Sequence, residues 1–267
     1  MTAVLLLGAG LGLLPLLLVL GYLAWRGLPG LTPSLFLELP RPIGDVGGGL
    51  ANAFSGTAVL VGLATALGLP VGVLAGFQLA ERPQSRLSVT VRYVADVLNG
   101  TPSIVIGIAV WAAIVRPMQR FSALAGGVAL AVLLLPLVAR TTEEMLRVIP
   151  PALRQAALSL GYTEWRTAVR VIGPAALPGI VTGVLVALAR VAGETAPLLF
   201  TAFGNPFWSL DPGAPIAALP LQIFTYALSP YDAWQRQAWA AALVLVAAVG
   251  GLTFLGRSLA RRRSGRG

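Results

Sequence analysis

Residues 50–79 read LANAFSGTAVLVGLATALGLPVGVLAGFQL, thirty positions without a charged side chain. An α-helix rises 1.5 Å per residue, so about 20 apolar residues cross a hydrocarbon core of about 30 Å. The whole chain has the same character: of its 267 residues, 57% are hydrophobic and 11% are charged, with a mean hydropathy of +0.82. A soluble domain normally carries about 25% charged residues. We therefore predict an all-α integral membrane protein.

Apolar runs recur along the chain and predict six transmembrane helices. They cover residues 4–24, 50–79, 89–115, 124–145, 175–203 and 233–259. A cleaved signal peptide is the alternative for the first run, but no Lys or Arg precedes it and it exceeds the roughly 7–15 residues of a signal-peptide core. We expect a single transmembrane unit: a first span and external loop (1–49), a core (50–259) and a basic tail (260–267).

The basic residues, all 19 of them arginine, are distributed unevenly between the two predicted sides. Six spans place both termini on one side, together with Arg82, Arg86, Arg92, Arg140, Arg147, Arg154, Arg166, Arg170, Arg257, Arg261, Arg262, Arg263 and Arg266. The opposite side has Arg26, Arg41, Arg116, Arg120 and Arg236. Because cytoplasmic loops carry the excess of positive charge, we expect both termini to be cytoplasmic. The tail is then a topology anchor in a lipid bilayer, and no nucleic-acid partner is expected.

The sequence contains no histidine and no cysteine. Thiolate nucleophiles, disulfides, cysteine zinc sites and the usual neutral-pH general base are therefore excluded. The sequence also lacks a GxxxxGK[ST] loop and a GxGxxG turn after a strand. We expect no catalytic residue, metal or cofactor on this chain, so any driven work needs energy from another chain.

The longest predicted cytoplasmic connection, residues 147–173, has the pattern of a short amphipathic helix. Pro150 and Pro151 suit its start, and Gly161 suits a left-handed C-cap. One face would carry Leu153, Ala156, Ala157 and Leu160. Docking into a groove of a partner protein and lying flat on the membrane are both compatible with this small apolar face.

Several polar residues fall inside or near the predicted spans. Arg190 and Glu194 lie at spacing i, i+4 in the fifth span, where they would share one helix face. They serve either a passing anion or a buried ion pair that fixes helix packing. In the third span, the sequence NGTPS (99–103) predicts a broken helix whose second half turns its N-terminal N–H groups toward an anion, with a simple proline kink as the alternative.

Acidic and basic residues near the cytoplasmic ends allow further alternatives. Asp96 would pair with Arg140, pair with Arg190, or mark the end of its span. The segment RTTEE (140–144) is interpreted as a solvated helix end in preference to a gate. The external segment 204–232, rich in proline and aromatic residues, is expected to anchor at the membrane interface.

Two parts of the predicted loop resemble the EAA loop of ABC importer permeases. They are QAALSLG (155–161) and VIGP (171–174), with Gln155 in place of the usual Glu, Val171 in place of Ile and Gly173 in place of Leu. The resemblance implies a coupling helix that docks on an ATP-binding subunit. The residues that would form this contact are Arg154, Gln155, Ala156, Ala157, Leu160 and Gly161.

Longer strings resemble the PstA family of phosphate importer permeases, which have the type I importer fold. They are GGLANA (48–53) with Gly56-Thr57, ADVLNGTPSIV (95–105), RTTEEM (140–145), ARVAGETAPLLFTA (189–202) and SPY (229–231). The resemblance implies a bacterial inner-membrane subunit that works with a second permease, two ATPase subunits holding ATP and Mg, and an external phosphate-binding protein. The candidate residues for phosphate translocation are Arg190, Glu194, Thr195, Asp96, Asn99, Thr101, Ser103 and Arg140. Sulfate or molybdate transport is the alternative, followed by a secondary carrier or a membrane enzyme.

Overall fold

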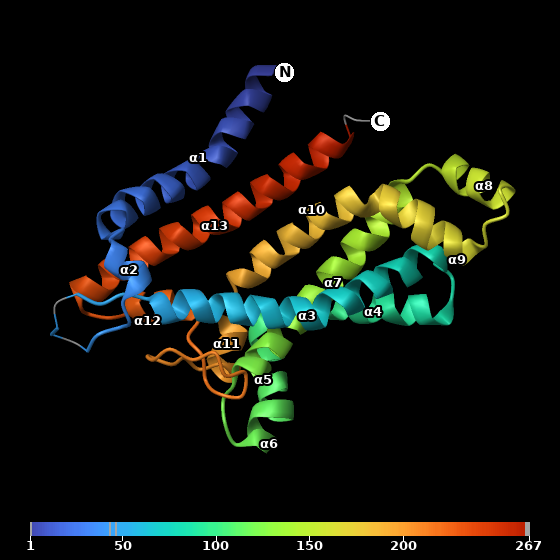
Figure 1. Ribbon diagram of the computed structural model, residues 1–267. Helices are drawn as coiled ribbons and strands as arrows, with labels where there is room; N and C mark the ends of the chain where they lie inside the picture. Colours follow the sequence, from blue (N-terminus) through green and yellow to red (C-terminus); the bar gives the residue numbers. More distant parts are fainter. Residues whose placement is uncertain (1, 43, 46, 265–267) are drawn as a thin grey trace.

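The computed structural model describes residues 2–42, 44–45 and 47–264, and its regular elements are all helical (Figure 1). In chain order these are α1 (Thr2–Gly27), η1 (Leu28–Gly30), α2 (Pro33–Leu37), α3 (Ala51–Glu81), α4 (Arg86–Gly100), α5 (Ser103–Val110), η2 (Trp111–Val115), α6 (Arg116–Met118), α7 (Ala123–Val148), α8 (Pro151–Ser159), α9 (Glu164–Thr167), η3 (Ala168–Ile172), α10 (Gly173–Ala192), α11 (Ala196–Thr201), α12 (Leu219–Ala227) and α13 (Asp232–Ser264). The side chains of the predicted basic tail, residues 260–267, lie outside the described set.

Five helical stretches are long and apolar enough to cross a membrane, and a bent pair makes a sixth. The five cover Gly10–Gly30, Ala51–Glu81, Ala123–Val148, Glu164–Ala192 and Asp232–Gly256. The bent pair, Arg86–Gly100 with Ser103–Met118, turns by 107° at its break. The prediction of an all-α membrane protein with six spans is confirmed on this basis.

The predicted limits of the fifth span are wrong. The helix was expected at residues 175–203, whereas the observed candidate span begins at Glu164, through α9 and η3, and ends at Ala192. Gly193 forms its C-cap and Pro197 lies in the first turn of the next helix, α11. A glycine followed closely by a proline stops a helix even in an apolar run, because the glycine closes the last turn and the proline cannot continue it.

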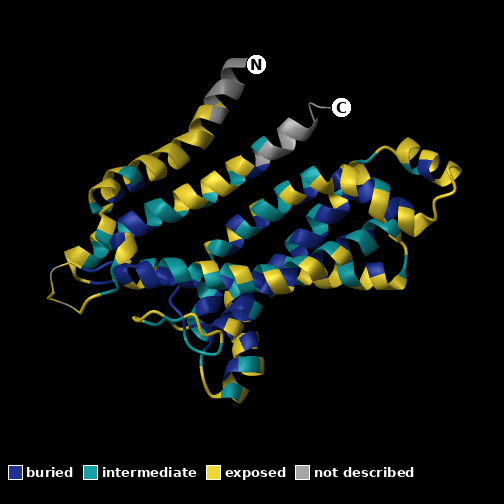
Figure 2. Ribbon diagram, viewed as in Figure 1, coloured by how far each residue is buried: buried dark blue, intermediate teal, exposed yellow. Residues whose placement is uncertain are grey.

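Helix α7 forms the centre of the bundle. Of its most apolar 18-residue window, 61% is buried, against 11–28% for the other continuous spans. Helices α3, α4 and α10 pack on it, and the buried residues in Figure 2 gather along it. Much of the remaining apolar surface, including most of the described side chains of α1 from Leu11 on, is exposed in the single chain, as expected of a surface that packs against lipid or other subunits.

The contact between α3 and α7 depends on small residues at every fourth position of α3. Gly68, Gly72 and Gly76 are buried against α7. A Cβ added to Gly72 would lie 2.8 Å from the Cβ of Val138, and one on Gly76 would overlap Thr142. Such a stripe lets two helix backbones approach closely in lipid, where dispersion forces hold helices together.

Polar contacts fasten the segment between α11 and α12 onto the N-terminal end of α3. The amide of Asn52 donates to the carbonyl of Asn205 at 2.6 Å, and the backbone N–H of Leu219 donates to the Thr57 hydroxyl at 2.7 Å. Gly56 lies directly under the carbonyl of Ala217, where a Cβ would not fit. This segment therefore forms a fixed cap over one end of the bundle.

We predict that Gly72→Val lowers the stability of the protein by about 1–3 kcal/mol, because the added methyl groups overpack the α3–α7 contact. Thermal unfolding in detergent, followed by fluorescence, measures the effect. Gly62→Val is the matched control: Gly62 lies on the same helix with nothing within 4 Å of its missing Cβ. Equal melting temperatures for both variants would contradict the role assigned to this contact.

Candidate functional site

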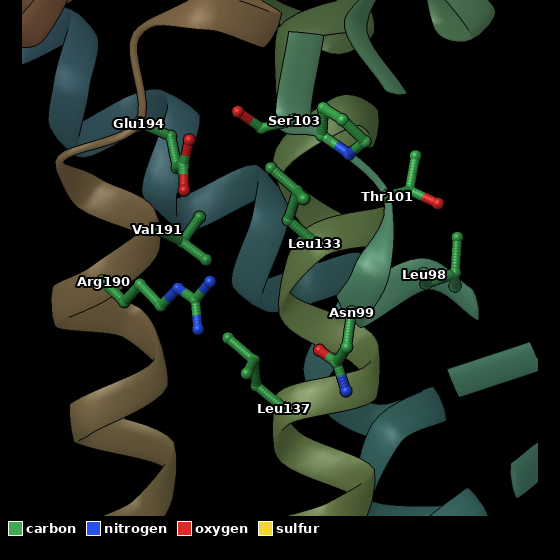
Figure 3. Close-up of a pocket in the computed structure, with 10 residues that line it drawn as sticks. Leu98, Asn99, Thr101, Ser103, Leu133, Leu137, Arg190, Val191 and Glu194 are labelled. Carbon is green, nitrogen blue, oxygen red and sulfur yellow. The ribbon is translucent and has the colours of Figure 1, made fainter. Parts of the chain in front are cut away.

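A cavity of about 230 Å³ lies where two helices break. One break separates α4 from α5 and the other separates α10 from α11. The cavity is lined by Leu98, Asn99, Thr101, Pro102, Ser103, Leu133, Leu137, Arg190, Val191 and Glu194 (Figure 3). The structure therefore brings together five of the residues predicted as site residues: Asn99, Thr101, Ser103, Arg190 and Glu194.

The first break confirms the predicted interruption at residues 99–103 and is much sharper than a kink. Helix α4 ends at Gly100, and the Thr101 hydroxyl donates to the carbonyl of Val97 at 2.7 Å. Helix α5 then begins at Ser103 behind Pro102, which supplies no side-chain cap. Its first-turn N–H groups carry the positive end of the helix dipole beside the cavity.

The second break corrects the expectation that Arg190 and Glu194 share one helix face. Arg190 lies in the last turn of α10, while Glu194 follows the helix end, with its backbone N–H bonded to the carbonyl of Val191 at 3.1 Å. Thr195 is the N-cap residue of α11 and does not line the cavity. Gly107 of α5 packs on Pro197 of α11, where an added Cβ would lie 2.6 Å from the proline Cα, so the segments after the two breaks hold each other in place.

The guanidinium of Arg190 points from α10 into the cavity (Figure 3). Among the described residues it forms no ion pair, so the interpretation of Arg190 and Glu194 as a packing ion pair is not supported by this structure. Arg190 is exposed in the single chain and lies in the last turn of a candidate span. A permanent charge within a membrane-spanning segment requires water, an opposite charge or an anionic ligand. The cavity thus presents a fork of N–H donors without a fixed acceptor.

Two other predicted site residues, Asp96 and Arg140, lie outside this cavity. They pair with each other, which selects one of the three alternatives for Asp96. Arg140 also approaches Glu143 at 3.7 Å, and Arg92 and Arg147 each bind a Glu143 oxygen at 2.7 Å. The Glu143 side chain is 3% exposed. The interpretation of 140–144 as a solvated helix end is therefore wrong for Thr142 and Glu143, which are buried, whereas Glu144 is exposed.

The loop predicted to dock on a partner forms a short helix with the expected limits. Helix α8 begins at Pro151, and Gly161 has φ +84°, the left-handed conformation of a C-cap. Of its apolar face, Ala157 is buried, whereas Leu153, Ala156 and Leu160 are exposed. This face remains open for another molecule, while Gln155 is exposed beside it.

Arg154 behaves differently from the other residues of the predicted coupling contact. Its guanidinium binds both oxygens of Glu81, at 2.6 and 2.5 Å, and so faces its own chain. These hydrogen bonds raise the pKa of Arg154 above its ordinary value, opposed in part by desolvation. Contact of Arg154 with a partner stays a prediction; within the single chain its guanidinium is bound to Glu81.

Sequence reasoning missed the cavity residues and ion pairs that depend on long-range packing. Leu133 and Leu137 line the cavity from α7, and Glu143, Arg92 and Glu81 form ion pairs with helices distant in sequence. A charged residue next to an apolar run is a local signal, but its partner depends on which helices become neighbours. No group of three or more Asp or Glu side chains in the described parts of the chain is placed to hold a metal.

Comparison with known proteins agrees with this architecture. Residues 68–264 match the family of binding-protein-dependent transport system inner membrane components. A phosphate transport system permease protein PstA from Yersinia pestis is 45% identical over 92% of this chain and 84% of its own length. A PstA from Xylella fastidiosa is 49% identical over 82% of this chain and 77% of its own length.

The chain belongs to the PstA family of binding-protein-dependent transport permeases. Among solved structures, the inward-facing MetNI methionine ABC transporter aligns with a TM-score of 0.62, covering 79% of this chain and 92% of that chain at 24% identity. This likeness confirms the type I importer permease fold. The chain is accordingly a multi-pass membrane protein.

We predict that Glu143→Gln destabilises the contact between α4 and α7 by about 2 kcal/mol, because charged hydrogen bonds from Arg92 and Arg147 lose their anionic acceptor. The melting temperature of the purified protein in detergent measures this. Glu144→Gln, an exposed neighbour on the same helix, is the control and should melt like the wild type. A Glu143→Gln variant as stable as the control would show that the buried carboxylate does not hold these helices together.

Proposed function

We propose that this chain is a permease subunit of an ATP-driven importer of inorganic phosphate. The observation that carries the proposal is Arg190, which has no ion-pair partner among the described residues and lines the cavity between two broken helices. The relatives of this chain are named phosphate transport system permeases. The guanidinium fork matches the oxygens of a phosphate group and forms charge-assisted hydrogen bonds with them.

Each polar residue of the cavity has its own role in the passage of the anion. Arg190 attracts the anion, the start of α5 offers N–H groups and positive dipole charge, and the hydroxyl of Ser103 and the amide of Asn99 replace lost hydration. Glu194, on the other side of the break, keeps the cavity from binding an anion permanently, because its negative charge lowers the affinity. No covalent step or cofactor is assigned to this chain.

The driving force comes from other subunits in this proposal. A second permease covers the exposed side of the cavity, two ATPase subunits with bound ATP and Mg contact α8, and an external phosphate-binding protein delivers the substrate. Closing of the ATPase pair shifts the permease between outward-open and inward-open states. The beginning of α1 and the end of α13 lie toward the same end of the bundle as α8 (Figure 1), which supports cytoplasmic placement of both termini.

The first test is uptake of labelled phosphate by bacteria that lack their own high-affinity system and carry this subunit with its partners. We expect ATP-dependent uptake that excess sulfate does not inhibit and that disappears when this subunit alone is omitted. Uptake blocked by sulfate would assign another oxyanion to the same architecture. Uptake that continues without the ATPase would point to a secondary carrier.

We predict that Arg190→Gln lowers phosphate uptake by about 10- to 100-fold, because one charge-assisted contact to the anion is lost. Initial uptake rates, normalised to the amount of assembled complex, measure the effect. Arg116→Gln, which removes an exposed arginine outside the cavity, should retain the wild-type rate. Normal uptake by the Arg190 variant would remove this residue from the pathway.

A further inference from the structure

Helix α8 projects from one end of the bundle and is largely exposed (Figures 1 and 2). Its main packing partners are neighbours close in sequence, α9 and η3, with Ala157 as its buried residue. A displacement of α8 therefore needs a further contact to reach the helices around the cavity.

One long-range contact joins α8 to the bundle. Glu81, the last residue of α3, binds the Arg154 guanidinium through both carboxylate oxygens at 2.5 and 2.6 Å. The Glu81 side chain is 17% exposed and that of Arg154 36%, so water screens this pair less than a surface pair. Two parallel hydrogen bonds also fix the relative orientation of the groups, which a single contact would not.

Glu81, the α3 partner of this ion pair, lies on a helix that packs closely against α7. Close packing at Gly68, Gly72 and Gly76 joins α3 to α7 over several turns, and α7 carries Leu133 and Leu137 of the cavity wall. A displacement of the α3 end therefore moves α7 with it, because a tightly packed contact between helices transmits strain.

The turn after Glu81 also connects the end of α3 to α4, the helix that ends at the first break. Gln78 donates to the Ser85 hydroxyl at 3.1 Å, and the Ser88 hydroxyl, which is fully buried, donates to the carbonyl of Arg82 at 2.6 Å. These bonds attach the start of α4 to the end of α3. Helix α4 then leads to Asn99 and the break that lines the cavity.

We propose that Glu81 is a positioning residue for coupling: through Arg154 it connects the α8 helix to α3, and so transmits the movement of α8 to both the α7 wall and the α4–α5 break of the cavity. This inference rests on the proposed function and assigns its mechanical link to a specific ion pair. Arg154 acts within the chain in this scheme, and the ATPase contacts the open face of α8 instead.

The functional test compares Glu81→Gln, Arg154→Gln and the charge swap Glu81→Arg with Arg154→Glu in the complete transporter, reconstituted in proteoliposomes with its binding protein. The readout is labelled phosphate imported per ATP hydrolysed. We expect each single variant to lower this ratio about tenfold while ATP hydrolysis continues, and the swap to restore most of it. Glu164→Gln, which removes a nearby exposed carboxylate without touching the pair, is the control and should retain the wild-type ratio.

A second measurement does not depend on the transported substrate. Since the chain has no cysteine, cysteines introduced at Ser159 on α8 and Leu74 on α3 are the labelling sites of this subunit, and both positions are exposed. Spin labels there report the α8–α3 distance by pulsed EPR with and without nucleotide. We expect one narrow distance in both states, a broad distribution in Glu81→Gln, and a narrow one again in the swap.

The two readouts separate the hypotheses. A wild-type complex that imports no phosphate but shows the expected EPR distances would overturn the substrate assignment and leave the link intact. Narrow distances in every variant, or an unchanged ratio of phosphate to ATP in the single variants, would overturn the role of Glu81. A swap that fails to restore either readout, although the complex assembles as well as the wild type, would also overturn it.

Discussion

The close contact between α3 and α7 determines the geometry of the rest of the molecule. In lipid, apolar surface gives little preference for helix association, so packing quality and polar contacts decide which helices pair. The glycine stripe of α3 gives α7 a neighbour along most of its length, and α4 and α10 pack on the remaining sides. Every ion pair or cavity residue on α7 is therefore placed by this contact.

Helix breaks inside a membrane protein leave backbone N–H and C=O groups without intrahelical partners, which lipid cannot satisfy. Here the two breaks face the same cavity, and the helices that follow them are fastened together at Gly107 and Pro197. Grouping the breaks confines the polar backbone to one place. The same grouping places a helix start, an amide, a hydroxyl and a guanidinium around one small volume, which is the set of groups that an oxyanion requires.

Local patterns in the sequence predicted the fold class, the break at residues 99–103 and the limits of α8, because each depends on hydropathy, proline or glycine within a few residues. The expected fifth span ends eleven residues too late, because hydropathy continues through Pro197. The burial of Glu143 and the pairing of Arg154 with Glu81 depend on contacts between helices far apart in the chain. Such partners follow from the packing of α7 and α3, which a single sequence does not show.

The arginines around Glu143 and the arginine in the cavity, Arg190, differ in how their charge is balanced. Around Glu143, three arginines and two carboxylates pair with one another near the end of α7, and their shared bonds join about two turns of α7 to α4. Arg190 has no such partner within the described residues, although Glu194 lies across the same cavity. A firm ion pair at Arg190 would compete with an entering anion, whereas Glu194 displaced beyond the helix break lowers the affinity without occupying the guanidinium. The end of α10 at Gly193 thus separates the two charges, and in the proposed function that separation keeps Arg190 available to the anion.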